Sequence, residues 1–83
     1  MSDSLMAEVV IPFAGQRFDM ELALFADVEV LIVECLRWVS EQSGLLPATG
    51  THFFCNSRTR EIICYGTRLC DTGIIRGDRL IIF

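Results

Sequence analysis

The chain has 83 residues, of which 52% are apolar, and its formal net charge is −4. This length holds one domain and leaves no room for a second core. The acidic balance argues against nucleic acid and anionic membrane as partners, because both require a cationic surface. No apolar run approaches the roughly 20 residues of a membrane span. The sequence therefore predicts a single domain over residues 1–83, without direct membrane insertion.

The first predicted elements form a β-hairpin. Residues 1–7 are expected to be flexible, and they lack the basic start of a secretory signal, so a cytoplasmic chain is expected. "EVVIPF" (8–13) is rich in strand-forming residues, and "AGQ" (14–16) is a turn sequence. "RFDMELAL" (17–24) alternates apolar and polar residues, which predicts a strand with one buried face.

Residues 28–43 are predicted to form an amphipathic helix. Asp27 is a suitable N-cap, and Gly44 is a suitable residue to end the helix. An apolar stripe runs along one side and consists of Val28, Leu31, Ile32, Cys35, Trp38 and Val39, with Trp38 expected to be a core residue. Val30 and Val33 fall on the polar side. They are candidates for a contact surface, although single exposed valines are commonly tolerated.

Three further strands are predicted after a loop at "LLPATG" (45–50). They are "THFFCN" (51–56), "EIICYG" (61–66) and "RLIIF" (79–83). The last contains neither Pro nor Gly, which suits a central strand lying parallel to the first. A single helix must bury its apolar stripe against a sheet. The predicted fold class is therefore α+β, with a mixed sheet in ββαβββ order packed on one helix.

The sequence offers little catalytic or metal-binding chemistry. The four cysteines have no C-x-x-C spacing, and the one histidine, His52, has no partner at the close spacing typical of zinc ligands. Buried thiols are favoured over a zinc site, and no metal or cofactor is expected. A Cys–His catalytic pair needs a pocket and a third orienting group, for which a domain this small has little room. No enzymatic activity is expected.

The tripeptide Arg76-Gly77-Asp78 has two interpretations. An adhesion ligand requires an exposed flexible loop on a secreted protein, and no secretory signal is recognised. Gly followed by Asp directly before an apolar run is typical of a turn that leads into a strand. The turn is the favoured interpretation.

The order of elements and the closing sequence resemble the ubiquitin-like β-grasp fold. In its closing pattern of Leu, acidic turn, Ile and final apolar strand, the corresponding residues are Leu69, Asp71, Ile74 and Leu80. The segments "RFDMEL", "FCN", "LCDTGI" and "GDRLIIF" are similar to the YukD/EsaB family, small ubiquitin-like proteins of the type VII (WXG-motif) secretion systems of Gram-positive bacteria. The resemblance extends over residues 8–83 and lies in the order of the motifs.

This resemblance implies a protein-binding module that does not undergo conjugation. Conjugated ubiquitin-like proteins and sulfur carriers act through a C-terminal Gly-Gly, whereas this sequence ends Ile82-Phe83 and contains no lysine. In ubiquitin-like folds the outer sheet face is a common docking surface. Strand alternation places His52, Phe54, Ile81 and Phe83 on that face, unless the alternation of strand 51–56 is inverted, which would exchange Phe54 for Phe53.

The expected function is an accessory or regulatory role in type VII secretion. Its partners are expected to be proteins of that machine, with homo-oligomerisation and attachment to the inner face of the membrane through a partner left open. One alternative is a ubiquitin-like cytosolic domain of a larger membrane component of the same machine. Another is a sulfur carrier or modifier, which the absence of Gly-Gly disfavours.

Overall fold

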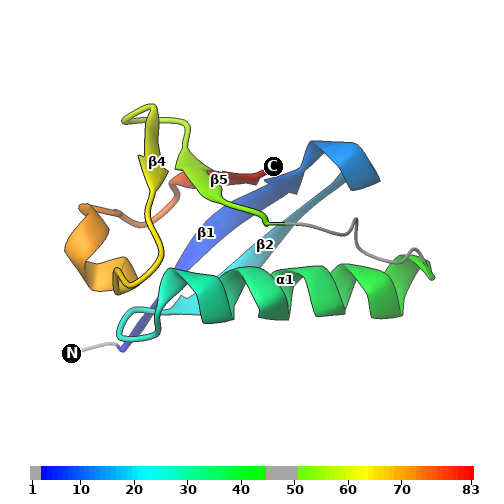
Figure 1. The fold of residues 1–83 in the computed structure, drawn as a ribbon, viewed down its shortest axis with the longest axis horizontal. Coiled ribbons are helices and arrows are strands. Elements are labelled where there is room, and N and C mark those ends of the chain that lie inside the picture. Colours follow the sequence, from blue (N-terminus) through cyan, green and yellow to red (C-terminus); the bar gives the residue numbers. More distant parts are fainter. Residues whose placement is uncertain (1–2, 45–50) are drawn as a thin grey trace.

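A computed structural model describes residues 3–44 and 51–83. The elements in chain order are β1 (Ser4–Ile11), the 3₁₀ turn η1 (Pro12–Ala14), β2 (Gln16–Ala23), α1 (Val28–Ser43), β3 (Phe54–Asn56), β4 (Glu61–Ile63), the 3₁₀ turn η2 (Leu69–Thr72) and β5 (Arg79–Ile82) (Figure 1). The predicted loop at 45–50 lies outside the described residues.

The strands form one mixed sheet in the order β2-β1-β5-β3-β4. β1 and β2 pair as the predicted antiparallel hairpin. β5 lies parallel to β1, with Val9 opposite Leu80, and antiparallel to β3 on its other side. The prediction that the last strand is central and parallel to the first is therefore confirmed.

Several predicted boundaries are wrong. β1 begins at Ser4, so residues 4–7, expected to be flexible, are paired with β2, and the Leu24 amide extends this ladder by donating to the Asp3 carbonyl at 2.8 Å. β1 ends before Pro12, which has no N–H to continue the ladder. β3 and β4 have three residues each, about half the predicted lengths: residues 51–53 precede the regular part of β3, and a turn at residues 65–66 follows β4.

α1 begins and ends as predicted. The Asp27 carboxylate accepts from the Glu29 amide at 2.9 Å, and this bond satisfies one of the free N–H groups of the first turn. Gly44 adopts a φ of 71°, and its amide donates to the Ser40 carbonyl at 2.9 Å. Within residues 3–44 and 51–83, no helix has the length and apolar character needed to cross a membrane.

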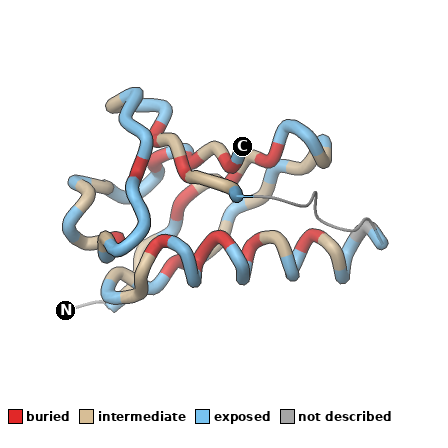
Figure 2. The backbone as a smooth tube through the Cα atoms, viewed as in Figure 1, coloured by how far each residue is buried: buried red, intermediate tan, exposed pale blue. Residues whose placement is uncertain are grey.

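The core lies between α1 and one face of the sheet (Figures 1 and 2). Its buried residues come from every strand, from α1 and from η2: Ala7, Val9, Ile11, Leu22, Val28, Leu31, Ile32, Cys35, Val39, Phe54, Ile63, Leu69, Leu80 and Ile82. Trp38 was expected among them, but its side chain is 38% exposed. Its ring lies at the margin, 4.4 Å from that of Phe18, because it occupies the edge of the helix stripe.

One buried carboxylate fixes the entry into β5. The Asp78 amide donates to the Ile75 carbonyl at 3.1 Å, and Gly77 takes a φ of 86°, as the third residue of a type II turn requires. The Asp78 carboxylate accepts from Arg58 Nε at 2.8 Å, Asn56 Nδ2 at 3.0 Å and the Ile75 amide at 3.0 Å. Because Asp78 is buried and fully engaged, Arg76-Gly77-Asp78 is a structural turn and not an adhesion ligand.

Candidate functional site

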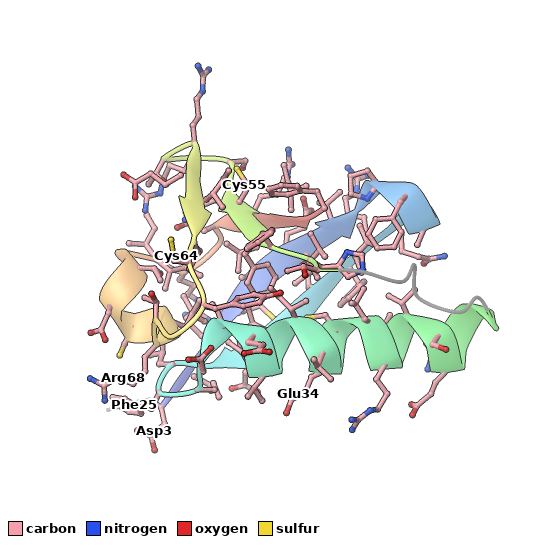
Figure 3. All side chains as sticks on the ribbon, viewed as in Figure 1. Asp3, Phe25, Glu34, Cys55, Cys64 and Arg68 are labelled. Carbon is pink, nitrogen blue, oxygen red and sulfur yellow. The ribbon has the colours of Figure 1, made fainter. Side chains whose placement is uncertain are left out.

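The outer face of the sheet, opposite α1, carries a row of mostly apolar side chains. Strand register places Val10, Ile81, Cys55 and Ile62 side by side across β1, β5, β3 and β4, and Arg17 of β2 ends the row. Their core-facing neighbours on the same strands are buried, so alternation directs these residues outward. Cys55 lies on the side of the sheet away from α1 in Figure 3. Ile62 is 57% exposed.

Aromatic side chains extend this row at one end. Phe53 and Phe83 exchange two backbone hydrogen bonds of 3.1 Å, which makes them a directly opposed pair with side chains on one face. The Phe53 ring lies 5.2 Å from that of Tyr65 and 6.2 Å from that of Phe83. The Tyr65 hydroxyl donates to the His52 carbonyl and holds the Tyr65 ring in place. We call Phe53, Cys55, Ile62, Tyr65, Ile81 and Phe83 the outer patch.

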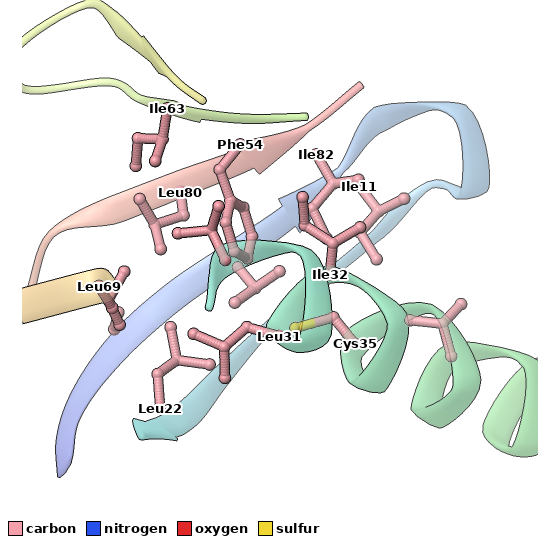
Figure 4. Close-up of a cluster of buried hydrophobic side chains, with 14 residues drawn as sticks. Ile11, Leu22, Leu31, Ile32, Cys35, Phe54, Ile63, Leu69, Leu80 and Ile82 are labelled. Atoms are coloured by element: carbon pink, nitrogen blue, oxygen red, sulfur yellow. The ribbon is translucent and has the colours of Figure 1, made fainter. Parts of the chain in front are cut away.

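The predicted outward position of Phe54 is wrong. Phe54 is fully buried and points towards α1 (Figure 4). Its register partner is Ile82, and directly opposed residues of an antiparallel pair face the same side, so the inward Ile82 places Phe54 inward too. Phe53 takes the outer position. His52 is half-buried and its ring stacks on that of Phe13, with the ring centroids 5.1 Å apart, so His52 is not among the residues of the outer patch.

The other candidate residues divide into two groups. Ile81 and Phe83 lie on the outer face as expected; Ile81 is half-buried, and Phe83 is 47% exposed. Val30 and Val33 are 50% and 48% exposed on α1, which covers the opposite face of the sheet. The structure therefore does not bring the two valines together with the outer patch.

Charged residues border the outer patch. Arg79 Nε lies 2.5 Å from Glu8 Oε1 on neighbouring strands. A surface depression of about 400 Å³ adjoins this pair, and it is lined by Met6, Glu8, Asp19, Arg58 and Arg79 among others. An apolar centre with a charged rim is the usual anatomy of a protein interface.

The cysteines differ sharply in accessibility. Burial raises the pKa of the Cys35 thiol to about 12, and the nearby Glu34 carboxylate adds to the effect, so this group is not a nucleophile at neutral pH. Cys64 is exposed, and Cys55 lies half-buried on the outer face. Among the described residues, no group of three His, Cys, Asp or Glu side chains is placed to hold a metal ion.

Sequence reasoning named Phe53 only as the alternative to Phe54, and it missed Tyr65. The signal for Phe53 was the alternation of side chains along β3. A shift of one residue in that alternation exchanges the two faces of the strand, and the sequence alone does not fix it. Tyr65 lies beyond β4, in a segment predicted to be strand, and its place against Phe53 depends on a tertiary hydrogen bond.

Among the comparisons with known proteins, only those with solved structures give matches, and they concern the fold. No family model matches the sequence, and no curated protein matches it. A chain of the MycP5-free ESX-5 inner membrane complex superposes with a TM-score of 0.78 at 22% identity, over 99% of this chain and 21% of the other. The ubiquitin-like domain of the Mycobacterium tuberculosis type VII secretion protein EccD1 superposes with a TM-score of 0.73 at 17% identity, over 99% and 98% of the two chains.

A third neighbour is a chain of the toluene 4-monooxygenase HD complex, solved with the inhibitor 4-bromobenzoate. It superposes with a TM-score of 0.77 at 9% identity, over 95% of both chains. Identities this low establish a common fold and nothing further. The five-stranded mixed sheet on one helix, matched along its whole length by a ubiquitin-like domain, is the predicted ubiquitin-like β-grasp.

Proposed function

We propose that this protein is a non-conjugating, ubiquitin-like binding module that serves type VII secretion from the cytoplasmic side. It acts by docking a protein partner on the outer patch, as an accessory or regulatory component and not as an enzyme. The observation that carries the proposal is the exposed apolar surface itself. Ile62, Phe83 and Tyr65 are 57%, 47% and 36% exposed and lie on one face, where aromatic and aliphatic side chains are expected at the centre of an interface.

Two of the structural neighbours support the choice of system. One is the ubiquitin-like domain of a type VII secretion protein and has nearly the same extent as this chain, and the other is a chain of the ESX-5 inner membrane complex. The sequence segments "LCDTGI" and "GDRLIIF", which resemble the YukD/EsaB pattern, agree with them. The toluene monooxygenase neighbour supports only the fold, because it is 9% identical to this chain and a shared fold does not imply a shared function.

One observation favours a second candidate. This chain spans 21% of the length of the ESX-5 neighbour, so in that neighbour the same fold is one part of a much longer chain, and this chain could likewise be a ubiquitin-like domain of a larger membrane component. Both candidates use the same surface, so the outer patch does not separate them. Sequencing the gene beyond the codon for Phe83 separates the two candidates. A reading frame that continues into apolar membrane-spanning segments favours the larger component.

The function is tested by deleting the gene and measuring export of the small WXG-type proteins. Complementation uses the native sequence, Ile62→Arg with Phe83→Arg, or Val30→Arg with Val33→Arg as the matched pair on α1. Each pair introduces two charges at exposed positions, so both variants should fold. We expect export to be restored by the native chain and the α1 variant, and lost with the outer-patch variant. Normal export without the gene contradicts the proposed system.

A further inference from the structure

The two edges of the sheet differ in what they offer a partner. β4 closes one edge with three residues, whereas β2 forms the other with eight. The Leu24 amide donates to the Asp3 carbonyl, and hydrogen-bonded pairs alternate along an antiparallel ladder. The even-numbered residues of β2 therefore bond to β1. The backbone N–H groups of Arg17, Asp19 and Glu21 point away from it, along the open edge.

β2 is protected against a further strand only by the exposed charges of Arg17, Asp19 and Glu21. Residues 16–23 contain neither Pro nor Lys, two residues that commonly prevent a further strand from pairing. Among the described strands, none lies beyond β2. The long, regular edge is therefore a template onto which another extended chain can add.

An apolar strip borders the open edge on the helix side. Phe18 and Met20 of β2 are half-buried and face α1. Phe18 contacts Trp38 at a ring separation of 4.4 Å, and Met20 Sδ lies 3.5 Å from Cys35 Sγ. Trp38 is 38% exposed, so the strip has surface left to cover. Apolar side chains of an added strand would meet this strip.

The charges at the edge specify the partner further. On the outer face of β2, the exposed side chains are Arg17, Asp19 and Glu21. Glu21 also accepts from the Ser4 hydroxyl at 2.6 Å. Glu34 lies one helical turn before Trp38 and projects from the lower side of α1 in Figure 3. Carboxylates thus outnumber guanidinium groups along this edge.

We propose that the open edge of β2 receives an extended segment of another protein as an added antiparallel strand. Basic residues of the segment lie opposite Glu21 and Asp19, and an acidic residue lies opposite Arg17. The residues between them are apolar and face the strip at Phe18 and Met20. The recognised pattern, from N to C, is basic–apolar–basic–apolar–acidic. This edge is separated from the outer patch by β1, so the inference is independent of the proposed function.

The test uses the intact protein and the synthetic peptide acetyl-Thr-Arg-Val-Arg-Val-Glu-Thr-amide. Amide hydrogen exchange is followed by NMR with and without the peptide. We expect slower exchange at the outward amides of Arg17, Asp19 and Glu21. The charge-reversed peptide, acetyl-Thr-Glu-Val-Glu-Val-Arg-Thr-amide, should bind about tenfold or more weakly than the first.

Two variants at one position separate backbone pairing from charge. Asp19→Pro removes the outward N–H, at a strand edge where proline is tolerated, and should abolish peptide binding. Asp19→Asn keeps the N–H and removes one charge, and should only weaken binding. Three results would overturn the proposal: equal binding of both peptides, protection at β4 in place of β2, or protection of the β2 edge without peptide that grows with protein concentration. The last would identify a second copy as the occupant.

Discussion

The two faces of the sheet carry similar side chains in different surroundings. On the inner face, Phe54 and Ile82 are fully buried beneath α1. On the outer face, Phe53 and Ile81 are their sequence neighbours and are only half-buried. One helix can cover only one face, so the same strands supply a core on one side and a partly exposed apolar surface on the other. Adjacent residues of one strand therefore differ in burial, and only the inner one belongs to the core.

The sharpest way to break this comparison is to truncate the two adjacent phenylalanines in turn. Phe54→Ala leaves a cavity in the core and should lower the free energy of unfolding by about 3–5 kcal/mol, which leaves a small domain partly unfolded. Phe53→Ala removes a ring from the outer patch and should cost about 1 kcal/mol or less. Urea unfolding followed by circular dichroism measures both. Equal losses would mean that the faces do not differ in this way.

The buried Asp78 allows a second comparison, between two Asp–Arg pairs. Asp78→Ala removes the acceptor of Arg58, of Asn56 and of the Ile75 amide, and should cost about 2–3 kcal/mol. In the matched control, Asp71→Ala removes a pair whose two side chains are 55% and 58% exposed, and should cost under about 0.5 kcal/mol. Both values come from urea unfolding. A small loss for Asp78→Ala would show that this network is dispensable.

Acid should destabilise the folded protein by protonating the carboxylate of Asp78. Hydrogen bonds from Arg58 lower the pKa of Asp78 from 3.8 to about 2 in the folded chain, against the opposing effect of burial. Its contribution to stability is therefore complete above pH 3.8 and is lost as the pH falls from there towards 2. The urea concentration at the midpoint of unfolding should decrease as the pH falls over this range. In Asp78→Asn this decrease should be smaller. The same slope in the native protein and in Asp78→Asn would exclude Asp78 as the cause.

The smallest expected effect is a difference in reactivity between an exposed and a buried cysteine. Cys64 is exposed, whereas Cys35 is buried and has a pKa raised to about 12. Iodoacetamide at pH 8 should modify Cys64 first and Cys35 only after unfolding in urea, because the thiolate is the reactive form. Peptide mass spectrometry identifies the modified residue. Early modification of Cys35 would show that the inner face opens in the native state.

Local signals in the sequence predicted most of the fold. Asp27 and Gly44 marked the ends of α1, and the alternation from Phe18 to Leu22 marked β2. The absence of Pro and Gly in residues 79–83 predicted the central strand. These signals depend on neighbouring residues in the chain, so no tertiary information was needed.

The outer patch was only partly predictable, because it depends on register between distant strands. Ile81 and Phe83 were placed correctly from the last strand alone. The face of Phe54 is set by its pairing with Ile82, 28 positions away in the sequence. Nothing local distinguishes Phe53 from Phe54, so the choice between them required the structure.

The most direct test of the account is the recovery of type VII membrane components with the tagged protein from its own cells. The account predicts that they co-purify with the native chain and with Val30→Arg/Val33→Arg. The amount of these components recovered should fall about tenfold or more with Ile62→Arg/Phe83→Arg, while the free energy of unfolding of that variant changes by less than about 1 kcal/mol. Equal recovery with the folded outer-patch variant would contradict the claim that this face of the sheet is the docking surface.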